Sequence, residues 1–419
     1  MRDSRYLANT AQTAFSGALM IFLALGMAAT ASAGPERDQA KRIHDRLVGT
    51  PPSIACLDQL EARMPDARAV ALDAIDNTGG TDECTDPSFY NVTLKNFITP
   101  WTNEEQSVFA PLNDYTATVI GIIRDDLDFR EILHGNILYI GGNGVSPAYS
   151  NDSNAHYEAM EDQGANLADP DQLRKRTQTE ITGLPDTATA GIITTRAAAR
   201  AFFIDGTNRA MFRFTLLNHL CTDLEQIKDP TRTHDRIPQD VARSPGGDSR
   251  IFMSACVGCH AGMDPLHQAL AYYDFEYPDG NPDGGQLVYN RAGFEDPDTG
   301  SRVQGKYRIN ANNFEFGYVV TDDQWENYWR AGPNSVLGWD PNLTFDGYEA
   351  PGKGAGAKSF GMEFAYSEAF ARCQVKKVFK AVCFRPPNDS QIDTLVTTFK
   401  GGYRLKDVFA ESAADCRGD

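Results

Sequence analysis

Apolar positions recur at helical spacing near both ends of this chain. Ile43 and Leu47 lie four residues apart, the run stops at Gly49, and Ser53 is placed to cap a second helix. Close to the C terminus, the apolar residues of 392–399 follow the i, i+3, i+4, i+7 pattern of one helix face. Both ends of the chain are therefore predicted to be helical.

The middle of the chain carries more mixed signals. Helical patterns return over residues 188–203 and 208–220, whereas 141–185 is rich in Gly, Asn, Asp and Ser and predicts a long surface loop or domain junction. Residues 285–290 and 306–309 alternate apolar and polar side chains around a turn-rich stretch, which predicts a small β-hairpin.

These patterns predict a mainly α fold. At 419 residues the chain exceeds the length that one core usually serves, so we expect two domains. The predicted order is a signal peptide over 1–33, a helical N-terminal domain over 34–140, a loop-rich junction over 141–186, and a second helical domain over 187–419. The second domain contains the hairpin near 285–310.

The first 33 residues have the layout of a secretory signal. Arg2 and Arg5 precede an apolar stretch over 15–31, and the Ala-Ser-Ala of 31–33 fits the cleavage pattern. The mature protein is then expected to be periplasmic or secreted. No later segment reaches the roughly 18 apolar residues that a spanning helix needs, so no membrane span is expected after cleavage.

The charge balance is acidic, with a formal net charge of −18. This argues against nucleic acid as a partner, because the phosphate backbone repels an acidic surface. It favours a basic docking patch on any protein that binds this chain. Acidity that serves solubility alone is the alternative explanation.

The chemistry of the sequence is concentrated in Cys256-Val257-Gly258-Cys259-His260. In an exported protein, C-x-x-C-H is the attachment signal for c-type haem, in which two thiols bind the porphyrin and the histidine ligates the iron. Residues three apart share one helix face, so both sulfur atoms can reach one edge of the macrocycle. The motif predicts one covalent haem c, held by Cys256, Cys259 and His260.

Other uses of a C-x-x-C fit the sequence less well. Zinc needs a second ligand pair at comparable spacing, and the other six of the eight cysteines form no C-x-x-C. A thioredoxin-like motif belongs to a βαβ pattern, which the sequence does not show.

The motif continues as Met263-Asp264-Pro265-Leu266, followed by Ala269-Leu270 and Asp274. This resembles the signature C-x-x-C-H-x-x-M-D-P-L-x-x-A-L-x-x-x-D of the planctomycete-type cytochrome c proteins. The resemblance implies a mainly helical, exported haem c protein with a cytochrome c-like domain and a redox partner. His267 stands where that family usually has glycine.

Two further residues are needed at the haem site: an acceptor for the Nδ1–H of His260, and a sixth ligand for the iron. Pro265 lies five residues after His260, where its carbonyl is expected to accept the imidazole Nδ1–H; Asp264 and Pro265 also suit the start of a new helix. Met263 and His267 lie on the helix face of His260 and cannot easily reach the far side of the iron. Met362, after a glycine-rich loop, is the first choice for the sixth ligand, and a methionine packed in the core is the competing interpretation. An open sixth position is a further alternative.

Weaker candidates complete the list of site residues. Met160 and Met211 are alternative sulfur ligands, and Arg243 and Arg250 are placed to pair with haem propionates or to be solvated charges. Trp325, Trp329 and Trp339 suit either a haem wall or an ordinary core.

Two functions follow from such a site. The first is electron transfer by an exported monohaem c-type cytochrome. The second is a haem enzyme, peroxidase- or oxidase-like, with an open iron position and a distal acid–base group at His219 or His234. We favour the electron carrier and leave enzymatic activity undecided.

The six remaining cysteines are even in number and suit disulfides in an oxidising compartment. Cys56–Cys84 is expected from proximity in the sequence. Cys373 and Cys383 would be roughly 15 Å apart on one helix, too far to bridge, so Cys373–Cys416 is the second expected pair.

Overall fold

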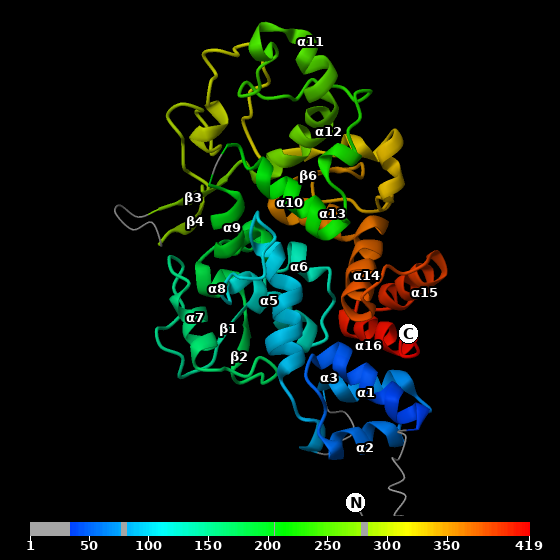
Figure 1. Cartoon of the computed structure of the whole chain (residues 1–419). Coiled ribbons are helices and arrows are strands. Elements are labelled where there is room, and N and C mark those ends of the chain that lie inside the picture. Colours follow the sequence, from blue (N-terminus) through cyan, green and yellow to red (C-terminus); the bar gives the residue numbers. More distant parts are fainter. Residues whose placement is uncertain (1–33, 77–81, 205, 278–283) are drawn as a thin grey trace, which may run out of the picture.

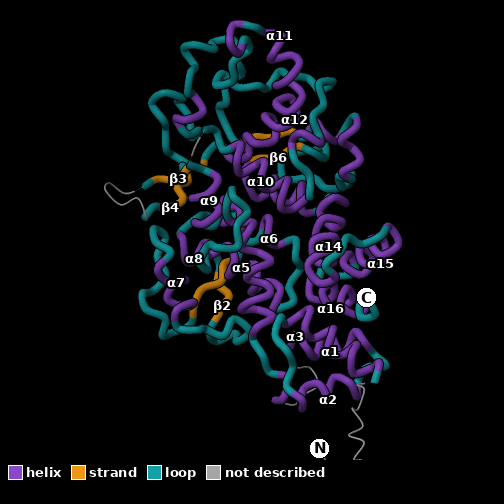
Figure 2. The backbone as a smooth tube through the Cα atoms, in the orientation of Figure 1, coloured by secondary structure: helices purple, strands orange, loops and turns teal. Residues whose placement is uncertain are grey.

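The computed structural model describes residues 34–76, 82–204, 206–277 and 284–419, and the predicted signal peptide lies outside these residues. The described chain is mainly helical, as its sequence predicts, and its few strands are short (Figures 1 and 2). None of the described helices is both long and apolar enough to cross a membrane.

The helices of the first half are α1 (Pro35–Val48), α2 (Ile54–Ala62), α3 (Ala67–Asp76), α4 (Lys95–Ile98), α5 (Asp114–Arg124), α6 (Glu131–His134), α7 (Ala155–Asp162), α8 (Gln178–Thr182), α9 (Arg196–Phe202) and α10 (Arg209–Leu220). Those of the second half are α11 (Ser249–Ile251), α12 (Val257–His267), α13 (Gly356–Ala365), α14 (Glu368–Cys383), α15 (Asp389–Lys400) and α16 (Leu405–Asp415). The strands are β1 (Leu138–Gly141), β2 (Leu173–Arg176), β3 (Tyr273–Glu276), β4 (Gln286–Tyr289), β5 (Gln324–Glu326) and β6 (Lys353–Ala355).

The local signals at the N terminus are confirmed. Helix α1 ends at Gly49, whose positive φ of 81° gives the left-handed turn that glycine adopts without strain. The Ser53 side chain accepts a hydrogen bond from the backbone N–H of Cys56 and caps α2. Helix α15 likewise buries the predicted stripe of Ile392, Leu395, Val396 and Phe399.

The two ends of the chain pack together. Helices α1 and α3 lie against α16, and Figure 1 shows the blue and red helices side by side. The Arg42 guanidinium on α1 donates to the carbonyl of Arg417 at 2.5 Å, so a polar contact also joins α1 to the residues that follow α16. Residues from both sides of the predicted boundary at 140 share one hydrophobic core. The boundary itself stays a prediction.

The stretch from 141 to 185 is more ordered than its composition predicts. It contains α7, β2 and α8, and β2 pairs antiparallel with β1. Tyr157, Met160 and Leu173 from this stretch are almost fully buried. The expectation of one long surface loop is therefore wrong, because scattered apolar residues without periodicity can still pack when neighbouring elements supply the core.

The predicted hairpin has a different partner strand. Strand β4 pairs with β3, in the register Tyr273 to Tyr289, and not with residues 306–309. Those residues end a 3-10 helix, Gly305–Arg308, in which Tyr307 is buried. Alternation over four residues suits a short turn as well as a strand, and it does not identify the partner.

Three disulfides join the chain. Cys56–Cys84 is confirmed. The pair Cys373–Cys416 is wrong, since Cys373 bonds Cys221 and Cys416 bonds Cys383. Both Cys373 and Cys383 lie on α14, as expected, but they face different neighbours. Cys373 faces the end of α10, where Cys221 lies, and Cys383 faces the end of α16, where Cys416 lies.

The Cys221–Cys373 bond closes a loop with a sequence separation of 152 residues. Helices α11 and α12 and strand β6 fall within this loop and form the upper part of the molecule in Figure 1. The C-x-x-C-H motif thus belongs to a segment whose two ends are joined covalently.

Candidate functional site

The C-x-x-C-H motif lies on a continuous helical run. Asp248 caps α11 by accepting from the backbone N–H of Arg250. A π-helical turn, Phe252–Cys256, then leads directly into α12. Cys256 and Cys259 are therefore placed one turn apart, as the spacing predicts.

Cys256 and Cys259 are the two cysteines of the eight that form no disulfide, and both are partly buried. The Cys259 thiol lies 3.7 Å from the carbonyl oxygen of Leu224. Burial, and then the negative charge of Glu225, raise the pKa of Cys259. A thiol with a raised pKa is a poor match for the reactive thiolate of a redox motif, which needs an electropositive setting.

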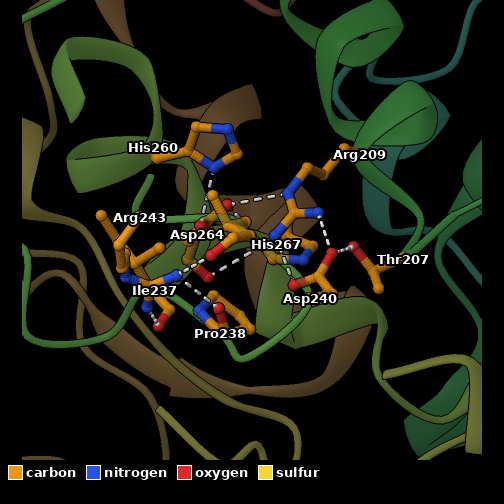
Figure 3. A network of polar contacts seen from close by, with 10 residues as sticks. Thr207, Arg209, Ile237, Pro238, Asp240, Arg243, His260, Asp264 and His267 are labelled. Atoms are coloured by element: carbon orange, nitrogen blue, oxygen red, sulfur yellow. Dashed lines mark hydrogen bonds and ion pairs between the residues drawn. The ribbon is translucent and has the colours of Figure 1, made fainter. Parts of the chain in front are cut away.

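His260 follows the two cysteines at the edge of a buried polar network (Figure 3). Its side chain is 20% exposed, and its Nδ1 lies 2.9 Å from Oδ2 of Asp264. An ionised carboxylate only accepts hydrogen bonds, so Nδ1 carries the hydrogen and Nε2 keeps its lone pair in the neutral ring. For Nε2, no hydrogen-bond partner is found among the described residues.

The acceptor on His260 is thus Asp264, where the sequence predicts the carbonyl of Pro265. Helix α12 continues to His267, so Pro265 lies inside its last turn and starts no new helix. A helical carbonyl points along the axis, whereas the side chain at i+4 lies on the same face as His260. This geometry favours the carboxylate over the backbone.

Asp264 is fully buried and has partners on both oxygens. Its Oδ1 accepts from Nε of Arg209 at 2.9 Å, and Arg209 also donates from Nη2 to Asp240 at 3.1 Å. Burial opposes ionisation of Asp264, but the charge of Arg209 and the hydrogen bond from His260 outweigh it and hold the pKa of Asp264 well below its usual range. The surroundings of Asp264 therefore favour its ionised form beside His260.

Arg243 completes the charge balance of this network. Its guanidinium donates to the carbonyl of Pro238 at 3.0 Å and also to the carbonyl of Ile237. It is therefore held by the backbone, whereas Arg250 forms an exposed ion pair with Asp248. Pairing of either arginine with propionates stays a prediction.

Met263 and His267 face the interior. Met263 is in the main core, and His267 is fully buried, with Nδ1 2.9 Å from the carbonyl oxygen of Asp264. The His267 ring stacks on Tyr307 with centroids 5.8 Å apart. Burial, and then the charge of Arg209, lower the pKa of His267 to about 4, so this side chain is neutral at pH 7.

Trp329 packs against α12 at Gly262. A Cβ at this glycine would lie 1.9 Å from Nε1 of Trp329. Trp325 and Trp339 are buried in the same main core. Trp329 therefore supports the motif helix from the interior, and α12 needs glycine at position 262 for this close approach.

Met362 lies in the middle of α13 and is half-buried. The glycine-rich stretch before it is strand β6 and the start of α13, so the expected flexible loop is wrong. Gly361 packs against the carbonyl of Leu133, which directs part of α13 toward α6. The polar partner of His260 among the described residues is Asp264, on the same helix. Ligation of the iron by Met362 stays a prediction.

The remaining candidates are distributed elsewhere. Met160 and Met211 are fully buried in the core. His219 is buried with its Nε2 3.1 Å from the hydroxyl of Tyr115, and burial lowers its pKa well below the usual value. His234 is exposed in a loop.

In the described residues, no group of three or more His, Cys, Asp and Glu side chains could hold a metal ion. Comparison of the chain with family models, with curated proteins and with solved structures found no match.

Asp264, Arg209 and Asp240 were not singled out from the sequence as site residues. A signal for Asp264 exists, because a carboxylate four residues after a ligating histidine lies on its helix face. No comparable signal exists for Arg209 and Asp240, which are 55 and 24 residues away from Asp264 in the sequence.

Proposed function

We propose that this chain is an exported monohaem c-type cytochrome that transfers electrons through one covalently bound haem. The observation that carries the proposal is the state of Cys256 and Cys259. Six cysteines form disulfides, and the two left unpaired are those of C-x-x-C-H, both partly exposed on one helical run. The next residue on that helix is a histidine whose Nε2 is free among the described residues.

These residues fit the group that the motif implies. Cys256 and Cys259 would hold haem c through two thioether bonds, and Nε2 of His260 would be one axial ligand. The haem would supply a one-electron redox centre. The resemblance of residues 256–274 to the planctomycete-type cytochrome c signature supports the same assignment.

The other features support an exported redox carrier. Three disulfides are typical of a protein that folds in an oxidising compartment, such as the periplasm or the outside of the cell. The net charge of −18 favours a redox partner with a basic docking patch, because complementary charge speeds the encounter of two proteins.

The test compares two double variants on haem-stained denaturing gels. Cys256→Ala/Cys259→Ala should lose the covalent stain. The matched control is Cys221→Ala/Cys373→Ala, which also removes two cysteines but should keep the stain. An unstained wild-type protein from a host that matures c-type cytochromes, or a stained Cys256→Ala/Cys259→Ala variant, would reject the proposal.

Absorption spectra of the ferric and ferrous wild-type protein separate the carrier from the haem enzyme. A low-spin, six-coordinate spectrum that cyanide changes slowly supports electron transfer. A high-spin ferric spectrum with rapid peroxide binding would favour the enzyme.

A further inference from the structure

The acceptor that His260 meets in this structure has a consequence for the redox property of the site. We propose that Asp264 is a positioning residue that increases the electron-donating strength of the His260 imidazole and thereby lowers the reduction potential. This inference rests on the proposed haem function and goes beyond it, because it names the residue that sets the potential.

The geometry gives Asp264 control over the ring. One carboxylate oxygen, Oδ2, contacts Nδ1 of His260 at 2.9 Å, and the other, Oδ1, accepts from Arg209 at 2.9 Å. With both oxygens occupied and the side chain fully buried, the carboxylate has little freedom to rotate. The orientation of the imidazole is then set by the same contact.

The carboxylate differs from a backbone carbonyl in charge. Hydrogen bonds to an ionised acceptor are roughly twice as strong as those between neutral groups. A carboxylate on the outer nitrogen of a ligating histidine makes the inner nitrogen more basic. A more basic ligand stabilises the more highly charged ferric iron, so the potential falls relative to a site with a carbonyl acceptor.

The surroundings allow this charge to be buried. Arg209 forms ion pairs with Asp240 and Asp264, and the charge of Arg243 also acts on both aspartates. Figure 3 shows Arg209 beside His260, and Asp264, Asp240 and Arg243 below it. Arg209 divides its donors between the two aspartates. Arg209 is therefore shared between two carboxylates and contacts Oδ1 of Asp264, while Oδ2 of Asp264 is directed at Nδ1 of His260.

The experiment measures reduction potentials of the holoprotein and three variants. Asp264→Asn keeps the shape but removes the charge, and its potential should be more positive than that of wild type. Asp264→Glu restores the charge and should return the potential toward wild type. The matched control is Asp114→Asn, which alters another buried carboxyl group, on α5, that accepts from the backbone N–H groups of Arg196 and Ala197. Its potential should be unchanged.

An Asp264→Asn protein that binds haem with an unchanged potential would overturn the inference and leave the proposed function standing. If this variant does not fold, the wild-type protein still tests the inference. Redox-difference infrared spectra with 13C-labelled aspartate should show a carboxylate band that shifts between the ferric and ferrous states. Absence of such a band would also overturn the role of Asp264. A wild-type protein without covalent haem would instead reject both proposals.

Discussion

The Cys221–Cys373 disulfide should contribute more to stability than either of the other two. Its sequence separation is 152, against 33 for Cys383–Cys416. In the chain-entropy model, closing these loops in the unfolded state contributes about 5 and about 3.7 kcal/mol, a difference of about 1.4 kcal/mol. The Cys221–Cys373 loop contains neither of the other bonds, so its contribution is independent of theirs.

The native state holds the loop ends together by other contacts. Lys377 on α14 donates to the carbonyl of Asn218 on α10 at 2.7 Å, and Gln374 donates to the carbonyl of His219 at 3.2 Å. Breaking the disulfide therefore leaves the folded geometry largely in place. The loss of stability arises mainly from the greater entropy of the unfolded chain.

The assay is guanidinium unfolding of the protein, followed by circular dichroism. In each disulfide, the two cysteines are replaced by alanine one after the other. The first replacement breaks the cross-link and removes one sulfur atom. The second replacement removes a sulfur atom without breaking a cross-link, so it measures the loss of packing energy alone. This loss is expected to be larger at the buried Cys383 and Cys416 than at the exposed Cys221. After this correction, a cross-link contribution from Cys221–Cys373 that is no larger than that from Cys383–Cys416 would refute the loop-length argument.

Three further outcomes are expected. Gly262→Ala should lower the free energy of unfolding by about 1–3 kcal/mol, because the added methyl group collides with Trp329; unchanged thermal unfolding would contradict this packing. Burial lowers the pKa of His134 to about 4, so the unfolded state binds more protons between about pH 4 and 6.5, and stability should fall as the pH drops through this window. His134→Gln should flatten that slope in pH-dependent unfolding by at most about 1.4 kcal/mol per pH unit, and an identical slope would show that other groups cause it. If Met362 ligates the iron, Met362→Ala should lower the reduction potential and convert the ferric spectrum toward high spin, whereas Met263→Ala should cost only packing; an unchanged spectrum for Met362→Ala would exclude it as ligand.

Features that depend on neighbours in the sequence could be predicted from the sequence. The end of α1 at Gly49, the Ser53 cap and the buried stripe of α15 each need only the residues within one or two turns. The helical spacing of Cys256 and Cys259 belongs to the same class. The geometry of one helix is universal, so residues three and four apart always lie on one face.

Features that depend on distant neighbours were decided by the tertiary structure. The partner of β4 is β3, Cys373 bonds Cys221, and residues 141–185 form helices and a strand where their composition indicates a loop. In each case several partners satisfy the local pattern equally well, and the packing of the whole core selects one.

The candidate site contains one contact set by residues close in the sequence and others set by the tertiary fold. His260 and Asp264 are four residues apart on α12, so their contact follows from helix geometry alone. Arg209, on α10, and Asp240 reach Asp264 only because the chain folds back on itself, and their charges keep the buried carboxylate ionised. The sequence by itself determined which residues are the candidate haem ligands, whereas the tertiary structure decided the charge that His260 meets, because burial and long-range ion pairs exist only in the folded protein.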